Sequence, residues 1–317
     1  MLERHRKRRR QLILTAVLLL LALGAGGWYL WAEQLAPRLA AELSRNRFYV
    51  AVQPSLRAAV PDESGPVAAA VRSMQVETDA WSRYNWTAAV PESGEQDGDF
   101  FADAVFLGDS LTDGLMLYSA IRPANVLAVK GVSVFSIGSK PVLPNPKGGA
   151  DLTILDALEQ DESYGKIYVL LGVNELGEPS DTRFIEAYGA LVDRLKASYP
   201  AADIYVQSMM PVNEGKVRSA GLARAITNEN IARRNELILQ LCAEKEVFFL
   251  DLFNLMADET GMLPREETND GVHLYISGYQ KWYAYLCSHA ALPPPLPGAP
   301  TGRLDLLSGI ELLKPEE

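Results

Sequence analysis

The chain has 317 residues, of which 48% are hydrophobic and 22% are charged, and its formal net charge is −10. This is the composition of a globular protein with a sizeable core, which excludes an intrinsically disordered chain. Residues 1–10 hold six bases and one acid, so the remainder has 24 bases against 39 acids and a net charge of −15. An acidic body of this kind argues against nucleic acid as a partner.

The N-terminal segment predicts a membrane anchor. Residues 12–31 form an uncharged, mostly apolar stretch that ends in the aromatic run 28–31. About 20 such residues suffice to span a bilayer as a helix, and the basic segment 1–11 predicts a cytoplasmic N-terminus. We therefore expect a single-pass transmembrane signal-anchor at 12–31, with the rest of the chain on the extracytoplasmic side. The alternative is a signal peptide cleaved near residues 22–24, which would release a secreted protein.

Residues 32–100 predict a stalk or linker, because they are rich in Ala, Pro, Ser, Gly and acids. Trp81, Tyr84 and Trp86 interrupt this composition and can pack on the following domain as an N-terminal extension. The domain itself is expected at residues 101–291. An irregular tail is expected at 292–317, where prolines are frequent from residue 293 onward.

The domain alternates short apolar runs with helical patterns, which predicts an α/β fold. The apolar runs lie at residues 104–107, 126–129, 167–171, 204–206 and 247–250. They are apolar throughout, as in parallel strands that helices cover on both faces. Five such strands predict a three-layer α/β/α sandwich with the flavodoxin-like strand order 2-1-3-4-5. Ligands of such sheets bind beyond the carboxyl ends of the strands.

Residues that can take part in catalysis follow the strands, at the predicted carboxyl edge of the sheet. Ser110 follows the first strand and opens a helical pattern, Gly131 follows the second, and Asn174 follows the third. A loop after the fifth strand adds Asp270 and His273. A serine at the start of a helix lies beside backbone N–H groups that can stabilise a developing oxyanion.

The number of histidines narrows the choice of a general base for Ser110. The chain has His5 in the basic segment, His289 at the end of a predicted helix, and His273. Only His273 lies at the predicted edge, and Asp270 can fold back to accept a hydrogen bond from its ring. A loop-capping Asp beside a solvated His is the alternative for this pair considered alone.

Asn174, Gly131 and the backbone of Ser110 are candidate donors of an oxyanion hole. Asn174 and Gly131 can equally be turn residues, because both tolerate a positive φ. Glu175 either contacts the site residues without contacting the substrate, or is a solvated acid at a helix N-terminus.

Four separated blocks resemble the SGNH hydrolases, also called GDSL esterases and lipases. The blocks are Gly-Asp-Ser-Leu-Thr-Asp-Gly at 108–114, the loop glycine at 131, Gly-Val-Asn at 172–174, and Asp-Gly-Val-His at 270–273. The resemblance implies Ser110 as nucleophile, His273 as base and Asp270 as its orienting acid. It also implies an oxyanion hole made by Ser110, Gly131 and Asn174. The chain departs from the family pattern at Glu175, where that pattern has Asp.

The expected function is a membrane-anchored serine esterase that acts on short-chain esters, O-acetyl esters for example, and requires no cofactor or metal. The ester substrate is expected to be an O-acylated envelope glycan or a lipid. An acyltransferase that modifies envelope polysaccharide would use the same residues, and a non-catalytic surface binding module is a further alternative. The loops 141–149 and 212–223 do not distinguish acyl chain lengths. Cys242 and Cys287 are expected to be free on apolar helix faces, although a disulfide is allowed outside the cytoplasm.

Overall fold

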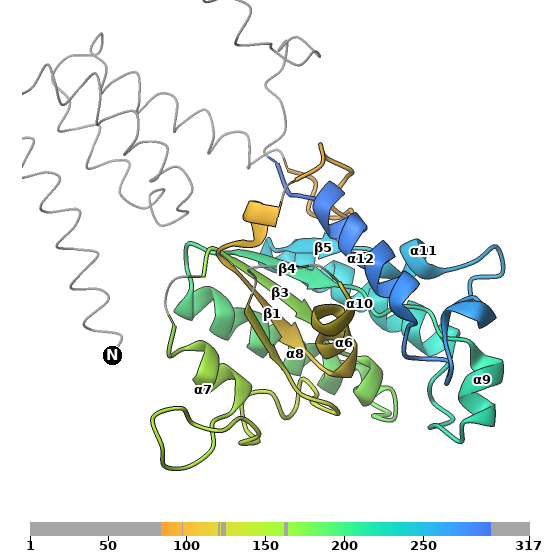
Figure 1. Cartoon of the computed structure of the whole chain (residues 1–317), viewed down its shortest axis with the longest axis horizontal. Coiled ribbons are helices and arrows are strands. Elements are labelled where there is room, and N and C mark those ends of the chain that lie inside the picture. The colour runs from red at the N-terminus through yellow and green to blue at the C-terminus, as the bar shows by residue number, and fades with distance from the viewer. Residues whose placement is uncertain (1–83, 97, 120, 122–124, 162–163, 293–317) are drawn as a thin grey trace, which may run out of the picture.

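The computed structural model describes residues 84–96, 98–119, 121, 125–161 and 164–292 (Figure 1). The predicted cytoplasmic segment, the anchor at 12–31, most of the linker and the tail from 293 lie outside the described residues. Among the helices that are described, none has the length and apolar character needed to cross a membrane.

A five-stranded parallel sheet forms the centre of the domain, and its order β2-β1-β3-β4-β5 is the predicted one. Each strand lies within a residue or two of the predicted bounds. The strands are β1 (Ala104–Gly108), β2 (Asn125–Ala128), β3 (Lys166–Leu170), β4 (Asp203–Gln207) and β5 (Phe248–Leu250). The inner strand β1 is buried along its whole length, whereas the edge strand β2 is only partly buried.

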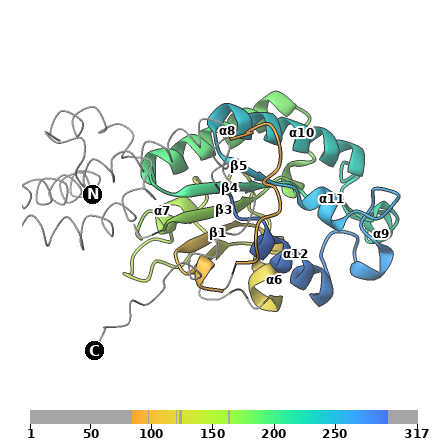
Figure 2. The ribbon, with the colours of Figure 1, turned by 90° about the horizontal axis from the view of Figure 1, so that it is seen from above.

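Helices cover both faces of the sheet, which confirms the three-layer sandwich (Figure 2). One face carries α7 (Ile154–Leu158), α8 (Asp181–Ser198) and α10 (Asn228–Lys245); the other carries α6 (Ser110–Tyr118), α11 (Leu252–Met256) and α12 (Ile276–Ser288). A further short helix, α9 (Glu214–Ser219), forms where only a loop was expected. The described residues also form the 3-10 turns η3 (Gly98–Phe101), η4 (Val173–Glu175) and η5 (Arg265–Glu267).

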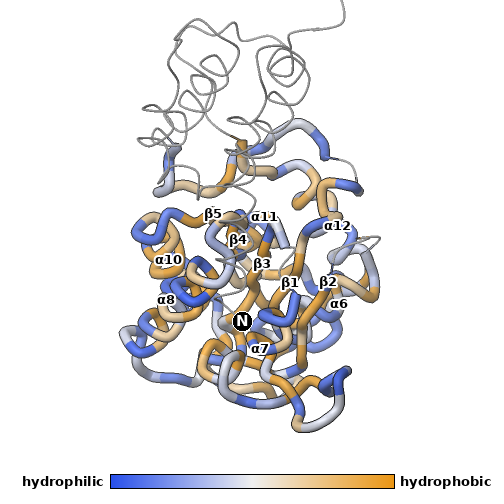
Figure 3. The backbone as a smooth tube through the Cα atoms, turned by 90° about the vertical axis from the view of Figure 1, so that its left-hand side faces the viewer, coloured by the Kyte–Doolittle hydropathy of each residue, from blue (hydrophilic) through white to orange (hydrophobic). Residues whose placement is uncertain are grey.

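The two long helices bury the residues that their sequence spacing predicts. In α8, Phe184, Tyr188, Leu191 and Leu195 all point into the core, and in α10 the set Ile231, Ile238, Leu241 and Cys242 does the same. Side chains three or four positions apart share one helix face. The buried face of α8 is apolar, whereas that of α10 also contains Arg234 and Asn235. The hydropathy-coloured trace shows the apolar strands in the middle of the domain (Figure 3).

A row of aromatic rings crosses the sheet on the α6/α12 face. Phe106, Tyr168, Tyr205 and Phe248 are partners in register on β1, β3, β4 and β5, and successive ring centroids lie 4.5, 4.6 and 5.0 Å apart. Trp86 extends the row, with its ring stacked 5.2 Å from that of Phe248. The segment just before the domain therefore packs on the edge of the sheet next to β5.

The two cysteines are free and buried. Cys242 belongs to the core beneath α8 and α10, whereas Cys287 belongs to the core beneath α6 and α12. Because the sheet separates these two cores, the disulfide alternative is wrong, and both thiols act as small apolar groups.

The contact between α6 and α12 depends on Gly114. A Cβ at this position would overlap the phenol ring of Tyr279. Gly189 in α8 is also buried, but a Cβ there would meet Leu241 at an ordinary 3.4 Å.

We expect Gly114→Ala to lower the free energy of unfolding by about 1–3 kcal/mol, because a methyl group there overpacks the helix interface. Gly189→Ala is the matched control, since Ala fits that position and favours the helix by roughly 0.5–1 kcal/mol. Urea denaturation of both variants measures the difference. Equal stability of the two variants would show that Gly114 is not a packing constraint.

Candidate active site

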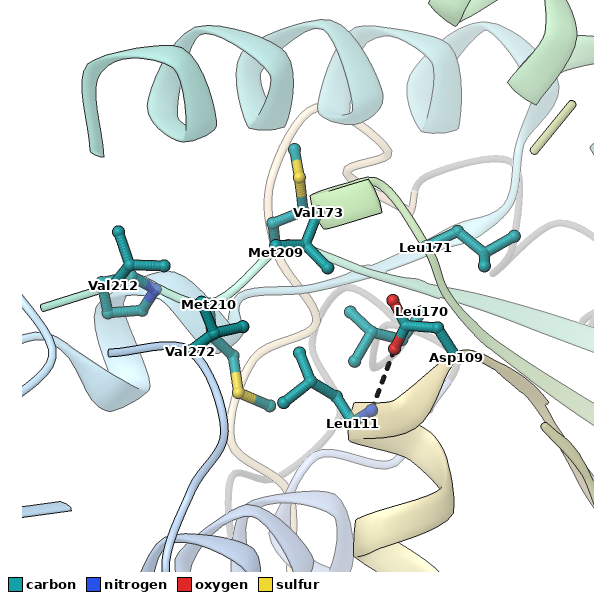
Figure 4. A pocket seen from close by; sticks show the side chains of 10 residues that line it. Asp109, Leu111, Leu170, Leu171, Val173, Met209, Met210, Val212 and Val272 are labelled. Atoms are coloured by element: carbon teal, nitrogen blue, oxygen red, sulfur yellow. Dashed lines mark hydrogen bonds between the residues drawn. The ribbon is translucent and has the colours of Figure 1, made fainter. Parts of the chain in front are cut away.

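Ser110 lies at the turn between β1 and α6, at the carboxyl edge of the sheet. Asp109 caps the helix, because its carboxylate accepts a hydrogen bond from the backbone N–H of Leu111 at 3.0 Å (Figure 4). Ser110 is the first residue of the helix and is partly exposed. The first N–H groups of a helix have no partner within it, so they are available to a ligand beside the serine.

Asp270 and His273 are held together by the loop that contains them. Oδ1 of Asp270 accepts hydrogen bonds from the backbone N–H groups of Val272 and His273, both at 2.9 Å. Its Oδ2 lies 2.7 Å from Nδ1 of His273. Gly271 has a φ of 94° and fits closely against the backbone of Asn213, where a Cβ would approach the carbonyl oxygen to 2.6 Å. The tight turn that unites the pair therefore requires a glycine.

The His273 ring also reaches the serine. Its Nε2 lies 2.9 Å from Oγ of Ser110, although the two residues are 163 positions apart. The structure thus brings together Ser110, His273 and Asp270 in one hydrogen-bonded chain. His289, in contrast, caps the far end of α12, where its ring bonds to the backbone of Tyr285.

Asp270 remains ionised at neutral pH. Desolvation raises its pKa, but hydrogen bonds from the His273 ring and from two backbone N–H groups outweigh this effect, and the net pKa lies below the usual value for Asp. An ionised Asp270 can keep the proton of the imidazole on Nδ1, which leaves Nε2 free to accept the serine proton.

Asn174 lies in η4, directly after β3, and its side-chain amide is already paired. Nδ2 donates to Oδ2 of Asp109 at 2.8 Å and to the carbonyl oxygen of Val132 at 2.9 Å. Asn174 is nevertheless exposed to solvent. These bonds place the amide between the serine turn and the loop after β2, and both of its hydrogens have protein acceptors before any substrate arrives.

Gly131 lies in that loop after β2, one residue before Val132. It is exposed, and its φ of 75° belongs to the left-handed region that favours glycine. Among the hydrogen bonds of the described residues, none connects Gly131 with Ser110 or His273. Its link to the site runs through Val132, whose carbonyl oxygen accepts from Asn174.

Two carboxyl groups are buried behind these residues. Glu175 is only 3% exposed, so its interpretation as a solvated acid is wrong; its Oε1 accepts from the backbone N–H of Val134 at 2.5 Å. Desolvation is the main reason that its pKa rises to about 7, and the charge of Asp109 adds to the effect. Asp109 is 1% exposed, and burial raises its own pKa to about 6 against the opposing hydrogen bond from Leu111.

Arg234 in α10 is the buried cation nearest this network. It is 1% exposed, its Nη1 donates to the carbonyl oxygen of Glu175 at 2.5 Å, and its Nε donates to Asp181 at 3.2 Å. The guanidinium also lies 4.5 Å from the ring centre of Phe184. Sequence patterns did not single out Arg234, because an Arg within a helix usually lies on the solvated face.

A small recess opens at the same edge, with a volume of about 10 Å³ (Figure 4). Its lining includes chain neighbours of the site residues: Asp109 and Leu111 beside Ser110, Val173 beside Asn174, and Val272 beside His273. Met209 and Met210, which follow β4, also line it. The lining is mostly apolar, and the Met210 side chain reaches toward Leu111. In the described part of the chain, no group of three or more His, Cys, Asp and Glu residues is placed to hold a metal ion.

Comparison with known proteins agrees with this architecture. A solved structure from Streptococcus pneumonia, provisionally described as a platelet activating factor, is 23% identical; the match covers 67% of this chain and 89% of that one, with a TM-score of 0.50. A GDSL-like lipase from Bacteroides thetaiotaomicron is 16% identical over 67% of this chain and 93% of its own, with a TM-score of 0.44. The first similarity shows that the fold is shared.

No curated protein matches the chain. The model of the GDSL-like lipase/acylhydrolase family, in contrast, matches residues 106–281, which is more than half of the chain and includes the serine turn, η4 and the Asp270–His273 loop. The chain belongs to the GDSL-like lipase/acylhydrolase family.

Proposed function

We propose that the protein is a serine esterase in which Ser110, His273 and Asp270 form the catalytic triad. The observation that carries the proposal is the hydrogen-bonded chain from Oγ of Ser110 to Nε2 of His273 at 2.9 Å, and from Nδ1 to Asp270 at 2.7 Å. Nucleophile, base and orienting acid have the contacts that acyl transfer requires.

The reaction begins when Ser110 attacks the ester carbonyl and His273 accepts its proton. The ionised Asp270 stabilises the resulting imidazolium, which then protonates the leaving alcohol. Water activated by His273 attacks the acyl-enzyme, the acid is released, and the proton returns to Ser110. No metal ion is needed for any of these steps.

The oxyanion is stabilised by the backbone N–H groups of Ser110 and Gly131 and by the Asn174 amide. The start of α6 supplies the first donor, and the Asn174 amide is bonded to Val132, the residue next to Gly131. Since both hydrogens of the amide are paired in the free site, an oxyanion must share one of them with Asp109 or Val132. Each such donor is typically worth roughly 3–4 kcal/mol in the transition state.

The recess supports a preference for short acyl groups. A cavity of about 10 Å³ is close to the lower limit for holding a single water molecule, and a methyl group is of similar size. The mostly apolar lining favours such a group over a charged one. We infer that the methyl group of an acetyl ester fits this recess beside the serine turn and that longer acyl chains do not.

We propose an extracytoplasmic glycan ester as substrate, with the catalytic edge remote from the end of the domain at which the described chain begins. The described chain begins beside Phe248 and ends just past α12, where Ser93 bonds to the backbone of Ser288. A helix of this length extends about 20 Å, so this end of α12 is remote from His273. Under the proposed anchoring by residues 12–31, the catalytic edge is free to face an O-acetylated envelope polymer, with lipid esters as the competing substrate.

A series of aryl esters tests the chemistry and the chain-length preference together, on residues 32–317. We expect kcat/KM to fall at least about tenfold from acetate to hexanoate, and Ser110→Ala to lower hydrolysis about 10⁴-fold or more. Met210→Ala enlarges the recess and should raise the hexanoate-to-acetate ratio about tenfold. Met256→Ala, a buried methionine in α11 on the same face of the sheet, is the matched control that leaves the ratio unchanged.

Wild-type rates in Ser110→Ala would disprove the esterase mechanism. A flat chain-length profile, unaffected by Met210→Ala, would instead disprove only the role of the recess. Acetylated glycans then replace the aryl esters, and release of free acetate without an added acceptor distinguishes hydrolysis from acyl transfer.

The anchor is tested on the full chain in cells. We expect the protein to stay with membranes after alkaline washing and to be degraded by protease added from outside. A protein that is recovered in the medium with its N-terminus near residue 25 would show a cleaved signal peptide instead.

A further inference from the structure

Glu175 is buried beside the active site, and the proposed mechanism assigns it no function. It follows Asn174 directly, yet its side chain points to the interior and is 3% exposed. Oε1 accepts the backbone N–H of Val134, and Oε2 is a buried oxygen without a hydrogen-bond partner in the described residues. Burying a carboxyl group with one oxygen unpaired is costly, so its presence calls for an explanation.

The bond to Val134 belongs to a two-point attachment of the loop after β2. Asn174 donates to the carbonyl oxygen of Val132 at 2.9 Å, and Glu175 accepts from Val134 at 2.5 Å. Two consecutive residues of η4 thus bind alternate residues of the loop. Gly131 immediately precedes the bound segment.

This attachment matters because β2 is an edge strand. Among the strands of the described residues it pairs with β1 alone, so it has a partner strand on one side only. At the start of the loop that follows, the N–H of Val129 donates to the carbonyl oxygen of Gly108 in β1 at 3.1 Å, and the N–H of Val132 donates to Val129 at 3.1 Å. Further turn bonds connect Ser133 with Ser136. Gly131 therefore lies between a bond to β1 at Val129 and the two bonds that η4 makes at Val132 and Val134, where both valines are buried.

Glu175 is in turn firmly held. Its carbonyl oxygen accepts hydrogen bonds from Arg234 at 2.5 Å and from the N–H of Glu178 at 2.8 Å. Arg234 is fixed by Asp181 and by the face of the Phe184 ring. The loop is thus connected through Glu175 to the packed layer of α8 and α10.

We propose that Glu175 is a positioning residue that sets the place of the Gly131 N–H in the oxyanion hole by holding the loop through Val134. The inference rests on the proposed esterase function. It also explains the departure from the family pattern: the acceptor needs the reach of Glu, and the shorter Asp ends one methylene group before Val134. The requirement is for length and for an accepting oxygen, and not for a negative charge.

The experiment compares Glu175→Gln with Glu175→Asp, using an aryl acetate and the full chain. Gln keeps the reach and the accepting oxygen, and kcat should stay within about threefold of wild type. Asp keeps the carboxyl group, but its shorter side chain does not reach the N–H of Val134. We expect kcat to fall about tenfold to 100-fold, with KM changed less than about threefold. Displacements of catalytic groups by an ångström or less have effects of this size.

Two controls separate positioning from general stability. Leu195→Ala creates a cavity near the end of α8 that is far from the site; it should lower the melting temperature and leave kcat unchanged. The second control repeats Glu175→Asp in an Asn174→Ala background. If Glu175 acts through the oxyanion hole, its effect on kcat should shrink there, because the two changes impair one function.

The proposal is overturned if Glu175→Asp retains wild-type kcat, if Glu175→Gln loses as much kcat as Glu175→Asp, or if the effects of Asn174→Ala and Glu175→Asp simply multiply. Ser110→Ala is assayed in parallel. Hydrolysis by that variant at wild-type rate refutes the esterase mechanism itself, whereas an inactive Ser110→Ala with any of the three outcomes above refutes the role of Glu175 alone.

Discussion

The hydrogen bond between Ser110 and His273 is the interaction on which the site depends. It joins two residues 163 positions apart over 2.9 Å, so it exists only if two distant loops meet at the same edge of the sheet. The parallel arrangement places the end of β1 there, and the packing of α6 against α12 brings the loop before α12 to it. The close fit of Tyr279 over Gly114 fixes the separation of these two helices.

Behind this bond lies a buried polar network that is expensive for the fold. Asp109 and Glu175 both have pKa values raised by burial, to about 6 and about 7, and Arg234 is buried with them. Apolar residues would cost less in such a position. Each of these groups instead bonds to a segment that carries a proposed catalytic donor. The network therefore lowers the stability of the fold but fixes the arrangement of the proposed oxyanion hole.

Much of the architecture could be predicted because it is encoded locally. Five uniformly apolar runs and the one-face spacing in α8 and α10 indicate a parallel sheet with two helical layers, and the strand order is the one common to five-stranded sheets of this type. The pairing of Ser110 with His273 could be predicted as well, since the sequence pattern places a single histidine at the expected carboxyl edge. The strand bounds shifted by a residue or so because backbone pairing with neighbours, and not hydropathy alone, decides where a strand ends.

The remainder depended on contacts between loops, which leave no periodic pattern. Glu175 follows a strand at the start of a short turn, where an acid is usually solvated, and its burial depends on Val134, 41 positions away. The pairing of Asn174 with Asp109 and the burial of Arg234 are of the same kind. The one available signal was the substitution of Glu for Asp in the third family block.

The most direct test of the account is covalent trapping of the nucleophile. Residues 32–317 are treated with a fluorophosphonate, and the modified peptide is identified by mass spectrometry. One label per molecule is expected, attached to Ser110, and the labelling rate should fall sharply in His273→Ala. A label on another residue, or a folded protein that takes up no label, would contradict it.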